Sequence, residues 1–168
     1  MTSIYSRAAL AAVLSLAAAA PAFAQAEADL DVAATVTENC IVSAGAMDFG
    51  DVDVTSGSHF DATAQLTVKC TSGTEWTASA DAGLGTGATV ASRKMQDGSA
   101  NLLSYGLFTD AGRATSWGAS AGESVGVFTG EGTGANQTKT IYGRVFGGQS
   151  SLPAGEYEDT VQVTVSYL

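Results

Sequence analysis

Residues 157–167 read YEDTVQVTVSY, with tyrosine or valine at five of the six odd-numbered positions and polar residues between them. Successive side chains of a strand point to opposite faces, so this period of two predicts a β-strand with one buried face. The same alternation occupies residues 26–36, 62–70, 76–80, 103–107 and 141–145. Turn residues separate these runs, and no helical period follows residue 24. The sequence therefore predicts an all-β fold, an antiparallel β-sandwich.

The first 24 residues have the form of a secretory signal peptide. Arg7 precedes a 13-residue apolar run at 8–20, and Ala22 and Ala24 form an A-x-A cleavage site. Thirteen residues are too few for a helix that crosses about 30 Å of hydrocarbon. We therefore expect export and a mature chain that begins at Gln25, which leaves 144 of the 168 residues.

Composition excludes several classes of function. Lys and Arg number 7 against 17 Asp and Glu, which gives a net charge of −10 and disfavours nucleic-acid binding. One histidine and two cysteines are too few for most zinc sites. Hydrophobic residues make up 45% of the chain, so intrinsic disorder is not expected, and the length suits one domain.

The two cysteines, Cys40 and Cys70, are expected to form a disulfide. An oxidising compartment favours joining the only pair, whereas a C-x-x-C redox motif is absent. Closing this loop would stabilise the fold by about 3–4 kcal/mol. A catalytic thiol is the alternative.

No group of residues forms a convincing catalytic or metal site. His59 and Asp61 lack a G-x-S-x-G elbow, so a turn histidine is the simpler interpretation, with a secreted hydrolase as the alternative. Asp48, Asp51 and Asp53 do not match an EF-hand loop, which leaves solvated carboxylates or weak calcium binding. Four aromatic residues suit a core better than a sugar-binding face: Trp76, Tyr105, Trp117 and Tyr142. We expect no enzyme and no cofactor.

Both ends of the mature chain are strand-like. No hairpin turn ties residues 26–36 to a neighbour, and the last strand runs to the C-terminus. An open apolar edge invites a strand from another chain, although the two ends could instead pair with each other.

Several strings, in this order and spacing, resemble the spore coat protein U domain, which is also the domain of archaic, Csu-type chaperone–usher pilins. These strings are NCIVS at 39–43, MDFG at 47–50, VKCT at 68–71, LSYGLFTD at 103–110, WG at 117–118, YGR at 142–144 and AGEYEDTV at 154–161.

The resemblance implies an incomplete immunoglobulin-like antiparallel β-sandwich that a donor strand completes. Residues 1–24 would be the signal peptide, 25–36 the donor strand and 37–168 the pilin domain. A periplasmic chaperone would lend a strand, and an outer-membrane usher would exchange it for the N-terminal segment of the next subunit. The product would be a surface pilus that supports adhesion and biofilm formation.

The resemblance also implies roles for particular residues. The donor strand would insert Ala26, Ala28, Leu30, Val32, Ala34 and Val36, of which the last two could belong to the first domain strand. The acceptor groove would include Val161, Val163, Val165 and Tyr167, and Cys40–Cys70 would tie the first two strands. The alternatives are a self-closed, secreted β-sandwich that binds a glycan or calcium, and a spore-coat-like protein. The small donor side chains would suit a minor subunit or such a coat protein.

Overall fold

The structure is a computed structural model that describes residues 24–118 and 125–168. The described residues contain ten strands and no helix, which confirms the all-β prediction. The strands are β1 (Cys40–Ala44), β2 (Phe60–Cys70), β3 (Glu75–Ala80), β4 (Arg93–Gln96), β5 (Leu102–Phe108), β6 (Ser116–Trp117), β7 (Val125–Gly126), β8 (Phe128–Glu131), β9 (Gln137–Val145) and β10 (Val163–Tyr167). No helix in this part of the chain could span a membrane. The expected signal peptide lies almost wholly outside the described residues.

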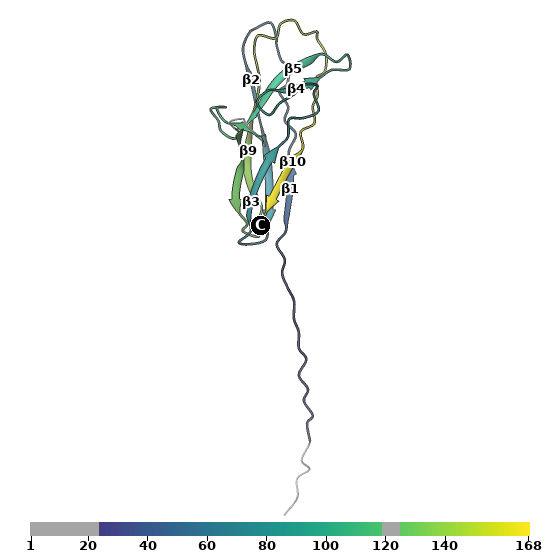
Figure 1. The fold of residues 1–168 in the computed structure, drawn as a ribbon, viewed down its shortest axis with the longest axis vertical. Helices are drawn as coiled ribbons and strands as arrows, with labels where there is room; N and C mark the ends of the chain where they lie inside the picture. The colour runs from purple at the N-terminus through teal and green to yellow at the C-terminus, as the bar shows by residue number, and fades with distance from the viewer. Residues whose placement is uncertain (1–23, 119–124) are drawn as a thin grey trace, which may run out of the picture. The chain divides into compact units, whose positions relative to one another are not determined.

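The strands form two sheets of an immunoglobulin-like sandwich (Figure 1). The larger sheet has the order β1-β2-β9-β5-β6-β7, with β4 also paired to β5, and the smaller has the order β10-β3-β8. All pairs are antiparallel except β6 with β7. The first domain strand and the last strand therefore lie at sheet edges, in different sheets.

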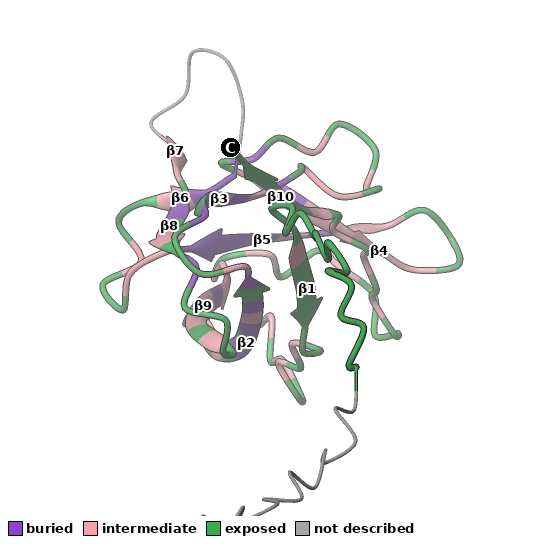
Figure 2. Cartoon of the chain, turned by 90° about the horizontal axis from the view of Figure 1, so that it is seen from below, coloured by how far each residue is buried: buried purple, intermediate pink, exposed green. Residues whose placement is uncertain are grey.

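Alternating apolar residues form the core between the sheets (Figure 2). In β2, Leu66 and Val68 are fully buried, whereas the residues between them face outward. Side-chain hydrogen bonds also join the sheets, since Trp117 Nε1 of β6 donates to the Ala78 carbonyl of β3 at 3.0 Å. Such a bond satisfies the polar atom of a buried indole.

Glycine makes room for the core at one position of β9. A Cβ atom on Gly143 would collide with the side chains of Met47 and Phe49. These two residues belong to the segment between β1 and β2, which packs on the inner face of the larger sheet without strand pairing. The glycine of the YGR string therefore makes room for the side chains of the MDFG string.

The strands predicted at 62–70, 76–80, 103–107 and 141–145 are confirmed as β2, β3, β5 and β9. The last strand was predicted from Tyr157, and this start is wrong because β10 begins at Val163. Glu158 instead forms a bridge with Gln96 of the larger sheet, while the Gln162 carbonyl accepts a bond from Asp81 beside β3. The chain thus crosses from one sheet to the other before β10 begins.

Candidate functional site: an open groove between β1 and β10

β1 pairs along one edge only, with β2. The Gly45 amide donates to the Gln65 carbonyl at 2.8 Å, and the Thr71 amide donates to the Asn39 carbonyl at 2.9 Å. Hydrogen-bonded and non-hydrogen-bonded pairs alternate in an antiparallel ladder. Three residues between these bonds therefore turn their backbone N–H and C=O groups toward the free edge: Cys40, Val42 and Ala44.

β10 likewise pairs along one edge, with β3. The Asp81 amide donates to the Gln162 carbonyl at 3.0 Å, and the Leu168 amide donates to the Glu75 carbonyl at 3.4 Å. By the same alternation, three residues of β10 direct their backbone groups away from β3: Val163, Val165 and Tyr167. β1 and β10 therefore each keep one edge without a strand partner among the described residues.

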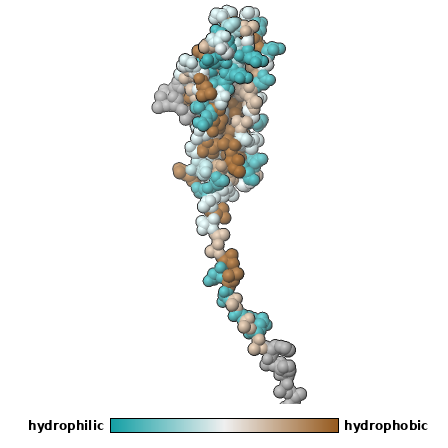
Figure 3. Space-filling model, turned by 90° about the vertical axis from the view of Figure 1, so that its right-hand side faces the viewer, coloured by the Kyte–Doolittle hydropathy of each residue, from teal (hydrophilic) through white to brown (hydrophobic). Residues whose placement is uncertain are grey.

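The inner face beside β1 is incompletely covered. Val42 and Ala44 share the face of their β2 partners Val68 and Leu66. The two β2 residues are 0% exposed, whereas Val42 is 38% exposed and Ala44 is also exposed. Figure 3, which shows the side on which β1 and β10 lie, has an apolar patch in the middle of this face. Apolar surface of this kind is typical of an interaction site.

Two adjoining cavities follow this opening. One has a volume of about 730 Å³ and lies between residues 44–49 and 157–163. The other has a volume of about 860 Å³ and lies between residues 47–55 and 152–158. We call the two cavities together the acceptor groove. Its floor is formed by side chains of the strands and of the segment that follows β1: Met47, Phe49, Met95, Tyr105, Leu107, Trp117 and Ile141.

The Asp159 carboxylate holds in place residues 157–163, which form one wall of the groove. Asp159 accepts hydrogen bonds from Tyr105 Oη at 2.6 Å and from the Leu84 amide at 2.7 Å. Burial, together with the bond to Asp159, raises the pKa of Tyr105 far above its ordinary value. Tyr105 therefore stays protonated and remains a donor, which ties β5 to the chain segment that precedes β10.

The predicted acceptor residues have different positions. Val161 and Val163 line the first cavity, and Val165 packs against the core. Tyr167 is 38% exposed and lies instead in a separate hollow with Trp76. The sequence reasoning missed Met47 and Phe49, although their MDFG string carried part of the family resemblance.

The predicted donor residues lie in an exposed segment. Residues 24–35 form a unit separate from the folded unit, residues 36–168, and take part in no strand pairing. Leu30 is 85% exposed, and Val32 and Val36 are each 84% exposed.

The predicted disulfide is confirmed. Cys40 and Cys70 are bonded and stand opposite each other in the β1–β2 register, with their Cα atoms 4.1 Å apart. This distance suits a non-hydrogen-bonded antiparallel pair. The bond fixes the first residue of β1 to the last residue of β2 and excludes a free catalytic thiol at these positions.

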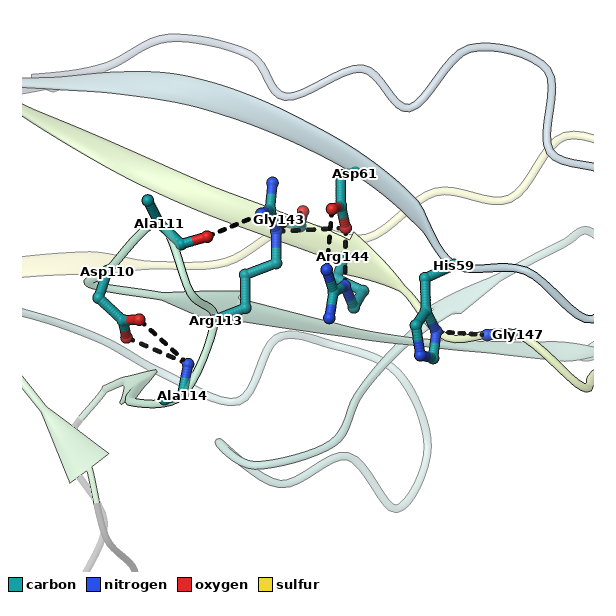
Figure 4. A network of polar contacts seen from close by, with 9 residues as sticks. All are labelled: His59, Asp61, Asp110, Ala111, Arg113, Ala114, Gly143, Arg144 and Gly147. Atoms are coloured by element: carbon teal, nitrogen blue, oxygen red, sulfur yellow. Dashed lines mark hydrogen bonds and ion pairs between the residues drawn. The ribbon is translucent and has the colours of Figure 1, made fainter.

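The hydrolase alternative is contradicted by the contacts of His59 and Asp61 (Figure 4). His59 is an exposed residue whose Nδ1 accepts from the Gly147 amide at 3.0 Å. Asp61 bonds with Arg144 Nε at 2.7 Å and pairs with Arg113 at 3.2 Å. The hydrogen bonds from Arg144 are the main reason that the pKa of Asp61 is lowered. The aspartate is therefore committed to two arginines.

Most of the residues considered for the binding-module alternatives have structural roles in the described part of the chain. Trp76, Tyr105 and Trp117 are each less than 5% exposed, so they belong to the core and form no sugar platform. Asp48 and Asp53 accept backbone amides within their own turns, from Gly50 and Thr55. In residues 24–118 and 125–168, no three His, Cys, Asp or Glu side chains are grouped as metal ligands.

Comparison with known proteins places the chain in a family. A family model described as the Spore Coat Protein U domain matches residues 26–164. Protein U of Myxococcus xanthus is 34% identical over 175 aligned residues, which cover 95% of this chain and 96% of the relative.

A solved structure has a similar fold. It is the crystal structure of the CsuC–CsuE chaperone–tip adhesion subunit pre-assembly complex from archaic chaperone–usher Csu pili of Acinetobacter baumannii. One of its chains matches with a TM-score of 0.56 and 20% identity. The match covers 78% of this chain, which spans only 40% of that chain's length. The family model and the Myxococcus relative confirm the resemblance seen in the sequence, and the chain therefore belongs to the Spore Coat Protein U domain family.

Proposed function

We propose that this protein is a structural subunit of a surface pilus, assembled through the chaperone–usher pathway by donor-strand exchange. The observation that carries the proposal is the acceptor groove, an opening with an apolar floor that is bordered by a free edge of β1 and a free edge of β10. A single added strand would pair with β1 on one side and with β10 on the other, and it would cover the exposed inner face.

The N-terminal segment, residues 25–36, has the pattern required of such a strand. Its apolar residues alternate with Glu27, Asp29 and Asp31, so one face would enter a neighbour's groove and the other would stay in water. Burying Leu30, Val32 and Val36, which are all exposed here, would contribute on the order of 5–8 kcal/mol. Backbone pairing along two edges would slow the release of the strand.

The comparisons support this assignment of partners. The structure with a similar fold pairs a chaperone with a tip adhesion subunit, according to its title. By analogy, the partners here are a periplasmic chaperone, an outer-membrane usher and other pilus subunits. Residues 1–24 would direct export, residues 37–168 would form the pilin domain, and the assembled fibre would stand on the cell surface and support adhesion and biofilm formation. The family is structural, so the chain has no enzymatic role.

The test is an SDS gel of surface-extracted protein, loaded with and without boiling. We expect a ladder of multimers that collapses to one band on boiling, because strand exchange traps the multimers kinetically. Val165→Asp should abolish the ladder, since this partly buried side chain of β10 packs against the core. Thr164→Asp is the matched control, because Thr164 is exposed on the opposite face of the same strand and the ladder should persist.

A folded protein that gives one monomer band in both lanes would refute the proposal. That result would favour a coat protein or a self-closed module.

A further inference from the structure

The acceptor groove would receive mostly small apolar side chains from this chain's own N-terminal segment. Its two cavities have volumes of about 730 Å³ and 860 Å³. Three of the six apolar positions in residues 25–36 are alanine, each with a single methyl group: Ala26, Ala28 and Ala34. Protein interiors are close-packed, and a gap beside a side chain forfeits dispersion contacts. Side chains this small would make fewer dispersion contacts with the groove than larger apolar side chains would.

The groove and the segment also carry charge of the same sign. Six carboxylate residues line the two cavities, without a Lys, Arg or His among the described lining residues. They are Asp48, Asp51, Asp53, Glu156, Glu158 and Asp159. Residues 25–36 add Glu27, Asp29 and Asp31 and no Lys, Arg or His. Like charges brought together at an interface slow association and disfavour the pair.

We infer that the acceptor groove receives an extended segment of a different protein, with large apolar side chains at alternate positions and Lys or Arg between them. A second copy of residues 25–36 is the poorer occupant in both side-chain packing and charge. The inference rests on the proposed function and specifies the partner of the same groove. Under it, this subunit assembles between unlike neighbours.

The test measures binding of labelled 12-residue peptides to the full mature chain by fluorescence anisotropy. The first peptide is residues 25–36 as they stand. The second carries Ala26→Leu, Ala28→Leu and Ala34→Leu, the third carries Glu27→Lys, Asp29→Lys and Asp31→Lys, and the fourth carries all six changes. A shuffled form of the fourth peptide, with its apolar period broken, is the control.

We expect the association rate of the lysine peptides to exceed that of the native peptide by about tenfold at low ionic strength. Adding salt should slow the lysine peptides and speed the native one, because salt screens both attraction and repulsion. The leucine changes should instead slow dissociation at every salt concentration, because they act through packing. In the chain itself, Glu156→Gln with Glu158→Gln should speed binding of the native peptide.

Three results are decisive against the inference. The inference is overturned if the native peptide and the peptide with all six changes bind equally fast and equally tightly. The proposed function would still stand. If the shuffled control binds as well as the fourth peptide, the effect is due to charge alone, and the inference is also overturned. If no alternating peptide binds, the proposed function itself fails.

Discussion

Arg93 is a charged residue with no exposed surface, and its guanidinium donates to backbone carbonyls on both sides of the sandwich. Its Nε donates to Asp81 beside β3 at 2.9 Å, and Nη2 donates to Trp117 of β6 at 2.7 Å. We expect Arg93→Met to lower the free energy of unfolding by about 3 kcal/mol, because it leaves buried backbone carbonyls without their hydrogen-bond donor. Urea unfolding followed by tryptophan fluorescence measures the loss. The control is Lys94→Met on the same strand, where one bond to Ser104 is lost and about 1 kcal/mol or less is expected. Equal losses would contradict the role assigned to Arg93.

Among the elements, β1 is an edge strand whose pairing a disulfide reinforces. Its strand partner is β2, and the Cys40–Cys70 bond fixes one end of the pair. We expect reduction of this bond to lower the free energy of unfolding by about 3–4 kcal/mol. Hydrogen exchange should accelerate at the β1 amides that face β2, such as Ile41 and Ser43, before it does in β9. The Cys40→Ala and Cys70→Ala double variant should behave alike without reductant. Unchanged protection of β1 after reduction would show that β2 holds it without the disulfide.

Alternation predicted elements well where the buried face belongs to one sheet throughout, as in β2 and β9. It failed before β10, because the segment that contains Glu158 and Gln162 keeps its apolar period while it crosses from one sheet to the other. A period of two reports which side of a strand is buried and says nothing about which strand is its partner. The groove floor could not be predicted for a related reason. Met47 and Phe49 fit there because Gly143, almost a hundred residues later, leaves space.

For the whole molecule, pH sets two electrostatic effects against each other. The net charge is −10 at neutral pH, so the excess carboxylates repel one another, and protonation of carboxylates at low pH relieves that repulsion. Against this, hydrogen bonds to the ionised form lower the pKa of four carboxyl groups below the ordinary value of 3.8: Asp53, Asp61, Asp97 and Asp110. A carboxyl group with a lowered pKa in the folded state contributes stability above its unfolded pKa and loses it as pH falls through the folded pKa.

Because salt screens the diffuse repulsion more than these short hydrogen bonds, we expect the bonds to decide the outcome at moderate ionic strength. The free energy of unfolding should be nearly constant from pH 7 to about pH 5 and should fall between about pH 5 and pH 3. Asp61→Asn should reduce the steepness of this fall, because the Asp61 carboxylate is the one that bonds with Arg144 and Arg113. Asp51→Asn, on an exposed loop, is the control substitution. Urea midpoints measured across this pH range test the prediction. Stability that increases continuously down to pH 3 would mean that relief of the net charge outweighs the four carboxylates, and that the fold is limited by its overall acidity.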